Sequence, residues 1–281
     1  MDPATSDLAD LAEGGLVADT PLRWGLRHRS EVITLPDGRH VVIRRFAGPD
    51  PAGELQRTIA MERRLREAGL PTPAVHATGK LDDGPVLLES FVDATPGSDW
   101  LDTPERARTL ARSAGAAAGD IRALPLDPVA DRPVPFDAVW RWVDVVRESL
   151  APATRVQLAA AVDRYATLHA MSAPAVVHGD LRPSNVLLDT DGDLAAILGL
   201  GAWRIGHPLL DVAWWGWSVR HASPEVAEAT WPVFLSAAGV ADSPETRIAI
   251  RTLEIAALLE RSATDPDPRW LGRLSAALGG A

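Results

Sequence analysis

Hydrophobic and polar positions along this chain of 281 residues follow two different periods. Three short runs in the first part alternate in the manner of β-strands: residues 31–35, 40–46 and 85–92. The turn Pro-Asp-Gly-Arg at residues 36–39 joins the first two runs as a hairpin. Residues 53–68 instead carry apolar side chains at helical spacing, and Gly69 marks their end. The order strand, strand, helix, strand predicts a small mixed lobe.

The remainder of the chain has mainly the helical period. Six segments show it: residues 103–124, 138–150, 153–171, 209–221, 224–238 and 243–262. Three β-rich runs interrupt them: residues 175–177, 186–188 and 194–198. The acidic turn 189–193 joins the last two runs, and residues 125–135 and 265–268 are expected to be loops.

These patterns predict an α+β protein with two lobes. Residues 1–20 are expected to form an acidic tail, either a weak helix or a frayed segment. Residues 21–92 are expected to form the small N-terminal mixed β/α lobe, and residues 93–281 the larger, mainly helical C-terminal lobe.

Composition narrows the range of functions. A formal net charge of −10 argues against non-specific nucleic-acid binding; it is compatible with a cationic substrate, although solubility is the simpler explanation. The absence of cysteine excludes disulfides and thiolate metal sites. The N-terminus lacks the pattern of a secretory signal, and no long uncharged apolar run is present, so we expect a cytoplasmic protein without a membrane span.

The strongest chemical signal is the run His-Gly-Asp-Leu-Arg-Pro-Ser-Asn at residues 178–185. Asp180 and Asn185 have the five-residue offset that separates the catalytic carboxylate from the metal-binding amide in a kinase catalytic loop. We therefore predict Asp180, His178 and Arg182 as catalytic residues, with His178 bracing the loop. Asn185 is predicted to be a metal ligand. The alternative is a polar turn between two strands.

Residues 178–187 resemble the catalytic loop of aminoglycoside phosphotransferases and of their choline-kinase and homoserine-kinase relatives. Four further segments resemble this family in the same order: residues 30–44, 62–73, 86–91 and 206–213. The resemblance implies a protein kinase-like fold, ATP or GTP as phosphoryl donor, Mg²⁺, and a hydroxyl acceptor.

The resemblance also implies roles for residues of the first lobe. Arg44 would hold the nucleotide phosphates with Glu62 as its helix partner, unless the two are solvated surface charges. Glu89 would belong to the nucleotide-binding hinge, and Ser90, Phe91 and Val92 would meet the adenine ring with backbone groups. Arg27 and Arg29 lie in the turn that covers the phosphates, where they either contact phosphate or form an ordinary basic turn.

One departure from the family pattern affects the metal. Relatives carry a second metal-binding Asp at the position of Gly199, and glycine offers no side-chain oxygen. Losing this ligand is expected to cost on the order of 10³-fold in rate, which puts Mg²⁺ in doubt. Asp191 and Asp193 could replace it, although they are expected to be turn residues.

Three hypotheses follow. In the first and favoured one, the chain is an enzyme, a phosphotransferase. Its acceptor would be an antibiotic, a sugar, an amino alcohol or a Ser/Thr peptide. A peptide acceptor would place it in natural-product biosynthesis. In the second, it is a pseudokinase-like binding protein that works with a partner enzyme. In the third, the pocket performs different, metal-independent chemistry.

Of the tryptophans, Trp214 and Trp217 are expected in the core and Trp203 near a ligand.

Overall fold

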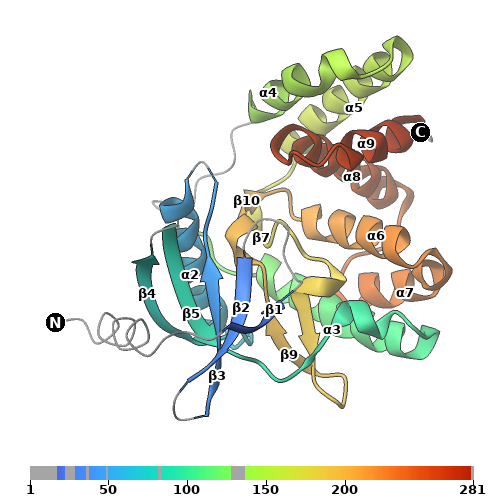
Figure 1. Ribbon diagram of the computed structural model, residues 1–281. Helices are drawn as coiled ribbons and strands as arrows, with labels where there is room; N and C mark the ends of the chain where they lie inside the picture. The colour runs from blue at the N-terminus through green and yellow to red at the C-terminus, as the bar shows by residue number, and fades with distance from the viewer. Residues whose placement is uncertain are drawn as a thin grey trace. The chain divides into compact units, whose positions relative to one another are not determined.

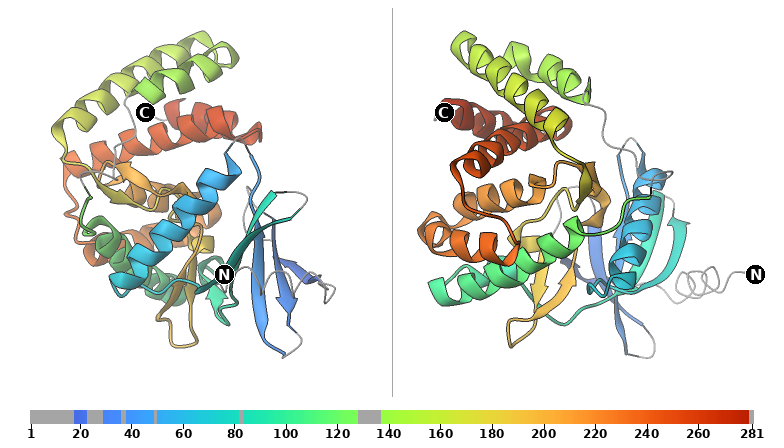
Figure 2. Two further views of the ribbon diagram at one scale, coloured as in Figure 1. Left: turned by 90° about the vertical axis from the view of Figure 1, so that its left-hand side faces the viewer. Right: turned by 180° about the vertical axis from the view of Figure 1, so that it is seen from behind.

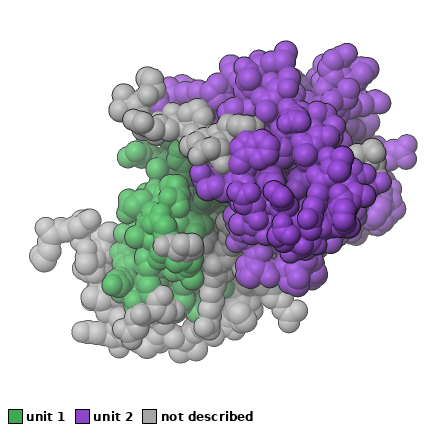
Figure 3. All heavy atoms as spheres, turned by 90° about the horizontal axis from the view of Figure 1, so that it is seen from above, with its two compact units in different colours: residues 1–100, 184–203 green, residues 101–183, 204–281 purple. Residues whose placement is uncertain are grey.

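The computed structural model describes residues 18–22, 29–35, 38–48, 50–81, 84–127 and 137–279. The chain forms two compact units (Figure 3). Unit 1 comprises Met1–Trp100 and Ser184–Trp203, and unit 2 comprises Leu101–Pro183 and Arg204–Ala281. The chain therefore passes from unit 2 to unit 1 within the predicted catalytic loop. None of the helices in the described ranges is long and apolar enough to cross a bilayer.

Unit 1 contains an antiparallel five-stranded sheet with the order β1-β2-β3-β5-β4 (Figure 1). Its strands are β1 (Ala18–Leu22), β2 (Arg29–Thr34), β3 (His40–Arg45), β4 (Val75–Leu81) and β5 (Gly84–Ser90). The three predicted strands are confirmed. Strands β1 and β4 were not predicted, and β1 begins inside the segment expected to be an acidic tail, whose residues 1–17 lie outside the described ranges.

Alternation gives this sheet two distinct faces. One face carries the apolar cluster of Ile33, Val41, Ile43, Ala77, Val86 and Leu88. On the other, Phe46 and Leu87 pack with Leu55 of α2 (Pro51–Glu67), the helix that lies along the sheet (Figure 2). Because side chains two residues apart share a face, Arg44 and Glu89 project toward the α2 side.

The remainder of unit 1 is a three-stranded antiparallel sheet with the order β6-β8-β9. These strands are β6 (Thr95–Pro96), β8 (Val186–Leu188) and β9 (Leu194–Ile197). The predicted hairpin between β8 and β9 is confirmed. Short 3₁₀ helices, η1 (Gly97–Trp100), η3 (Pro183–Asn185) and η4 (Leu200–Ala202), flank these strands.

Unit 2 is helical except for a two-stranded sheet of β7 (Ala175–Val177) and β10 (Arg204–Gly206). Its helices are α3 (Pro104–Arg122), α4 (Asp137–Val146) with η2 (Arg147–Ser149), α5 (Pro152–Met171), α6 (Leu210–Ala222), α7 (Pro224–Ala237), α8 (Pro244–Thr264) and α9 (Arg269–Gly279). The six predicted helices are confirmed, and α9 is additional. Helix α8 packs against α4, α5, α6 and α9, whereas α3 and α7 lie side by side (Figure 2).

Several helices begin in the same way, with a capping side chain followed by proline. Asp50 accepts a hydrogen bond from the Gly53 amide at 3.0 Å, and Thr103 and Ser243 accept from the amides three residues later at 3.3 and 3.2 Å. Proline then occupies the first helical position, where its missing N–H costs nothing. These local signals fix the helix starts before any tertiary contact forms.

Candidate functional site

The predicted catalytic loop is held in shape by a buried carboxylate of α6. Asp211 accepts hydrogen bonds from the backbone N–H groups of His178 and Gly179, at 2.7 and 2.9 Å. The Nδ1 atom of the buried His178 ring accepts the backbone N–H of Asp180 at 3.1 Å. Asp211 and His178 thus both hold the backbone of this loop by hydrogen bonds.

Asp180 is the centre of a cationic cluster. Its Oδ1 atom accepts hydrogen bonds from Arg261 Nη2 at 2.6 Å and from the indole Nε1 of Trp214 at 2.9 Å. Its Oδ2 atom lies 3.4 Å from Arg182 Nη2. Arg261 belongs to α8 and Trp214 to α6, so the loop is tied to two helices of unit 2.

These partners set the charge of Asp180. Burial alone would raise the pKa of its carboxyl group, but Arg261, Arg182, His178 and Trp214 outweigh burial and hold this pKa below the ordinary value. Asp180 is therefore ionised at neutral pH and is a weak base. Chemically it can accept a hydrogen bond from an acceptor hydroxyl and orient it, rather than remove its proton early.

Unit 1 contains the predicted metal position, and its backbone there is unusual. Gly199 has φ 77° and ψ 27°, a left-handed conformation that L-residues rarely adopt. A Cβ atom at this position would lie 2.6 Å from Asn185 Nδ2 and 3.1 Å from Asn185 Oδ1. The Asn185 side chain thus occupies the space into which a residue larger than glycine would project.

The residues present do not fit a conventional Mg²⁺ site. Residue 199 offers no side-chain oxygen, and no group of three acidic or histidine side chains that could hold a metal occurs in the ranges that the structure describes. Asp191 and Asp193 lie in the hairpin turn, where their backbone N–H groups both donate to Asp189 Oδ1 at 2.9 Å. They are the turn residues that the sequence favoured.

Arg44 lies in a second charged cluster, under α2. Its Nη2 atom is 2.6 Å from Glu89 Oε1, and Arg44, Glu62 and Glu89 are all buried. Burial, followed by the neighbouring charge of Glu89, raises the pKa of Glu62 to about 8. The ion pair of Arg44 is with Glu89, whereas Glu62 feels the charge of both, and Glu62 is largely protonated at neutral pH.

The hinge residues differ among themselves in environment. Glu89, one of the predicted nucleotide-binding residues, accepts a hydrogen bond from Arg44 through its side chain. Ser90 Oγ accepts the Ala74 N–H at 3.0 Å, which joins β5 to the segment before β4. Phe91 is exposed and Val92 half-buried. Arg27 and the side chain of Arg29 lie outside the described ranges.

The tryptophans that the sequence singled out have different environments. Trp203, expected near a ligand, donates its indole N–H to the Arg57 carbonyl at 2.7 Å and so anchors the chain to α2. In unit 2, Trp214 stacks on Trp217 with ring centroids 4.9 Å apart, and both lie within about 6 Å of Trp270. Trp214 is buried as predicted, while Trp217 is half-buried.

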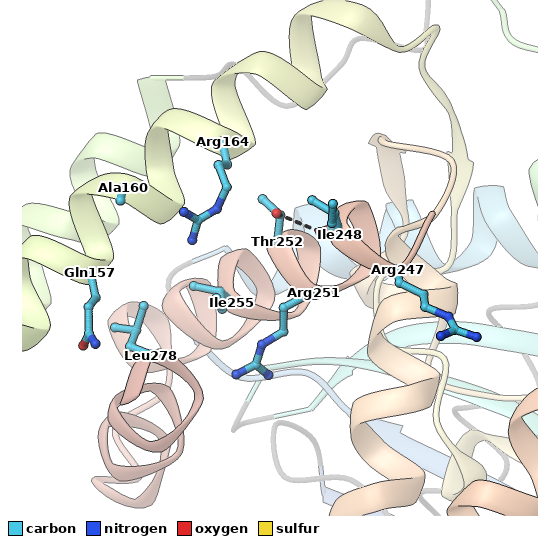
Figure 4. Close-up of a pocket in the computed structure, with 9 residues that line it drawn as sticks. All are labelled: Gln157, Ala160, Arg164, Arg247, Ile248, Arg251, Thr252, Ile255 and Leu278. Carbon is cyan, nitrogen blue, oxygen red and sulfur yellow. Dashed lines mark hydrogen bonds between the residues drawn. The ribbon is translucent and has the colours of Figure 1, made fainter. Parts of the chain in front are cut away.

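A separate pocket of about 550 Å³ lies among α5, α8 and α9 (Figure 4). Arg164 and Arg251 border it, and Ile255 and Leu278 contribute apolar walls. None of the residues predicted from the sequence to form the site lines this pocket.

Sequence reasoning did not identify Arg261, Asp211 or Trp270 as site residues. Asp211 lay within a segment that resembles the family, and its position after the apolar turn was an available signal. Arg261 is 81 residues from Asp180 and follows an ordinary helical pattern, so no local signal marked it. Trp270 lies in a helix that the sequence did not predict.

Comparison with known proteins agrees with this geometry. The model of a phosphotransferase enzyme family matches residues 20–247. The comparison with curated proteins gave no significant match.

Solved structures also resemble the chain. The GDP and kanamycin complex of APH(2")-IIia has a TM-score of 0.76 and 17% identity, covering 98% of this chain and 97% of that chain. The Streptomyces rimosus phosphotransferase APH(3'')-Id with ADP and streptomycin has a TM-score of 0.64 and 21% identity, covering 90% and 99%. A macrolide 2'-phosphotransferase type I has a TM-score of 0.64 and 18% identity, covering 99% and 97%. At these identities the likeness establishes the kinase-like fold.

Proposed function

Because the chain belongs to the phosphotransferase enzyme family, we propose that it transfers a phosphoryl group from ATP or GTP to a hydroxyl group of a small molecule or peptide. The observation that carries this proposal is the environment of Asp180. The loop is fixed by Asp211, and the carboxylate is kept ionised by two arginines. The structures with GDP and with ADP among the similar proteins support a nucleotide donor.

The proposed chemistry uses Asp180 for orientation. The acceptor hydroxyl donates a hydrogen bond to the carboxylate, its oxygen forms a bond to the terminal phosphorus, and the bond from that phosphorus to the bridging oxygen breaks. In a loose transition state the hydroxyl proton leaves late, so a weak base is sufficient. Arg182, whose Nη2 lies 3.4 Å from Asp180, would stabilise the negative charge on the transferred group.

The test is direct. Purified protein is incubated with ATP or GTP and with acceptors of each class, and nucleoside diphosphate release and phosphorylated acceptor are measured. Acceptor-dependent transfer that disappears in Asp180→Asn supports the proposal. Transfer that survives this substitution removes Asp180 from the reaction.

A second function is favoured by one observation. The position expected for the metal lacks a carboxylate at residue 199. In addition, the Asn185 side chain fills the space beside Gly199. This arrangement supports a pseudokinase-like protein that binds nucleotide or acceptor and works with a partner enzyme. Thermal stabilisation by ATP that is the same with and without Mg²⁺, together with no measurable transfer, would favour this role.

A further inference from the structure

A continuous chain of contacts leads away from Asp180 within unit 2. Arg261, which is hydrogen-bonded to Asp180, also stacks over the ring of Trp214, with its guanidinium carbon 5.3 Å from the ring centroid. Trp214 stacks on Trp217, and Arg273 of α9 lies over Trp217 and Trp270, at 5.6 and 4.4 Å. Three indoles and two arginines therefore form one cluster beside the catalytic carboxylate.

Arg273 differs from the other arginines of this region in its partners. Arg261 forms an ion pair with Asp180, and Arg269 forms one with Asp267 at 2.7 Å. Within the described part of the chain, Arg273 has no ion pair and no side-chain hydrogen bond, although it is half-buried. Stacking uses only the flat face of a guanidinium, so its in-plane N–H donors remain available for a ligand.

A second observation points to the same ligand. Trp270 is 3% exposed, and its indole N–H has no hydrogen-bond partner. An unpaired buried donor costs free energy, and such a cost is offset when a ligand supplies an acceptor oxygen. The unpaired donor and the cation without an ion pair belong to residues three positions apart on α9, and Asp267 acts on Arg273 only through its charge at a longer distance.

We propose that Trp217, Trp270 and Arg273 recognise the acceptor and select one that carries an anionic group beside a flat or sugar-like face. The inference rests on the proposed function, because it identifies the acceptor of that same site. The anion would meet the guanidinium edge of Arg273, and the flat face would stack on indole. A polycation such as kanamycin would meet like charge from Arg261 and Arg273.

A charge series of one sugar tests this selectivity in the full-length protein. Glucuronate, glucuronamide and glucosamine share a ring and carry a negative, a zero and a positive charge. Binding is followed by tryptophan fluorescence without nucleotide. We expect glucuronate to bind at least fivefold more tightly than glucuronamide, and glucosamine to bind most weakly.

Variants on α9 separate recognition from overall charge. Arg273→Gln is expected to abolish the preference for glucuronate, and Arg273→Lys to retain part of it. Arg269→Gln removes the same charge from the same helix and is expected to leave the preference intact. Equal affinity for the three sugars, no binding of any of them, or an equal loss in Arg269→Gln would overturn the inference.

Parallel turnover assays distinguish this inference from the proposed function. A preference for glucuronate without any phosphoryl transfer would refute the proposed reaction and leave the recognition site standing. Transfer to glucosamine in preference to glucuronate would confirm the reaction and refute the recognition of an anion.

Discussion

Two buried charged clusters of this protein, one in each unit, are opposite in composition. In unit 2, one carboxylate, Asp180, is shared by Arg261 and Arg182. In unit 1, one cation, Arg44, serves the two carboxylates Glu89 and Glu62. The pKa of Asp180 is accordingly held below its ordinary value, while that of Glu62 is raised to about 8. Burial acts on both carboxylates in the same direction, so the ratio of arginines to carboxylates decides which of them stays charged.

The comparison also separates two uses of buried charge. A carboxylate that is kept ionised can receive a hydrogen bond from a substrate hydroxyl. A pair of carboxylates that retains one proton instead makes the folded state sensitive to pH. The following predictions test this difference, beginning with the largest expected effect.

Asp180→Asn is expected to have the largest effect, a loss of about 10³-fold in phosphoryl transfer, because the amide cannot offer the acceptor hydroxyl a charged partner. Removing the carboxylate also leaves two arginines paired with no anion, which is expected to cost about 2–4 kcal/mol of stability. Rate is measured by nucleoside diphosphate release and stability by urea unfolding. Phosphoryl transfer at the wild-type rate in this variant would show that the ionised Asp180 carboxylate is not needed to orient the acceptor hydroxyl.

Arg44→Met leaves Glu62 and Glu89 without a cation. We expect a loss of about 2–4 kcal/mol at pH 8 and a smaller loss at pH 5, where protonation relieves the repulsion. Arg45→Met is the matched control on the same strand, since Arg45 lies 3.7 Å from Glu31 and its side chain is more exposed than that of Arg44; its expected cost is below about 1 kcal/mol. Similar losses of stability in both variants at both pH values would show that Arg44 does not balance the charges of Glu62 and Glu89.

Gly199→Asp adds the missing carboxylate to unit 1, but we expect no gain in turnover. The left-handed backbone and the contact with Asn185 are expected to cost about 1–3 kcal/mol. Gly199→Ala carries the Cβ atom without the carboxylate and is expected to lose a similar amount, which thermal unfolding would show. A gain of on the order of 10³-fold in Mg²⁺-dependent transfer for the Asp variant alone would show that the turn accommodates the residue after all.

Glu62→Gln is the smallest change in side-chain shape, and the size of its effect on stability depends on pH. The pKa of Glu62 is 4.5 ordinarily and about 8 in the folded protein, so between these values the unfolded chain releases a proton that the folded chain retains. Stability present below pH 4.5 is therefore lost progressively as pH rises through 8. Unfolding temperatures between pH 5.5 and 8.5 should fall less in the variant than in the wild type. Parallel curves would show that Glu62 does not retain the proton.

Local signals explain what the sequence allowed us to predict. The period of apolar residues located the central strands of the sheet and the six helices, and the offset between Asp180 and Asn185 indicated the candidate catalytic loop. Strand β4 was missed because Gly79 and Lys80 weaken its apolar alternation, and β1 because it follows an acidic segment. Arg261 and Glu89 could not be assigned their partners, because each pairing joins elements that are distant in the sequence.

The contact between Gly199 and Asn185 couples these two positions for any attempt to rebuild a carboxylate at this turn. A side chain introduced at residue 199 alone meets the amide of Asn185 at short distance. The smallest useful unit of redesign here is therefore a double variant, in which residues 185 and 199 are changed together.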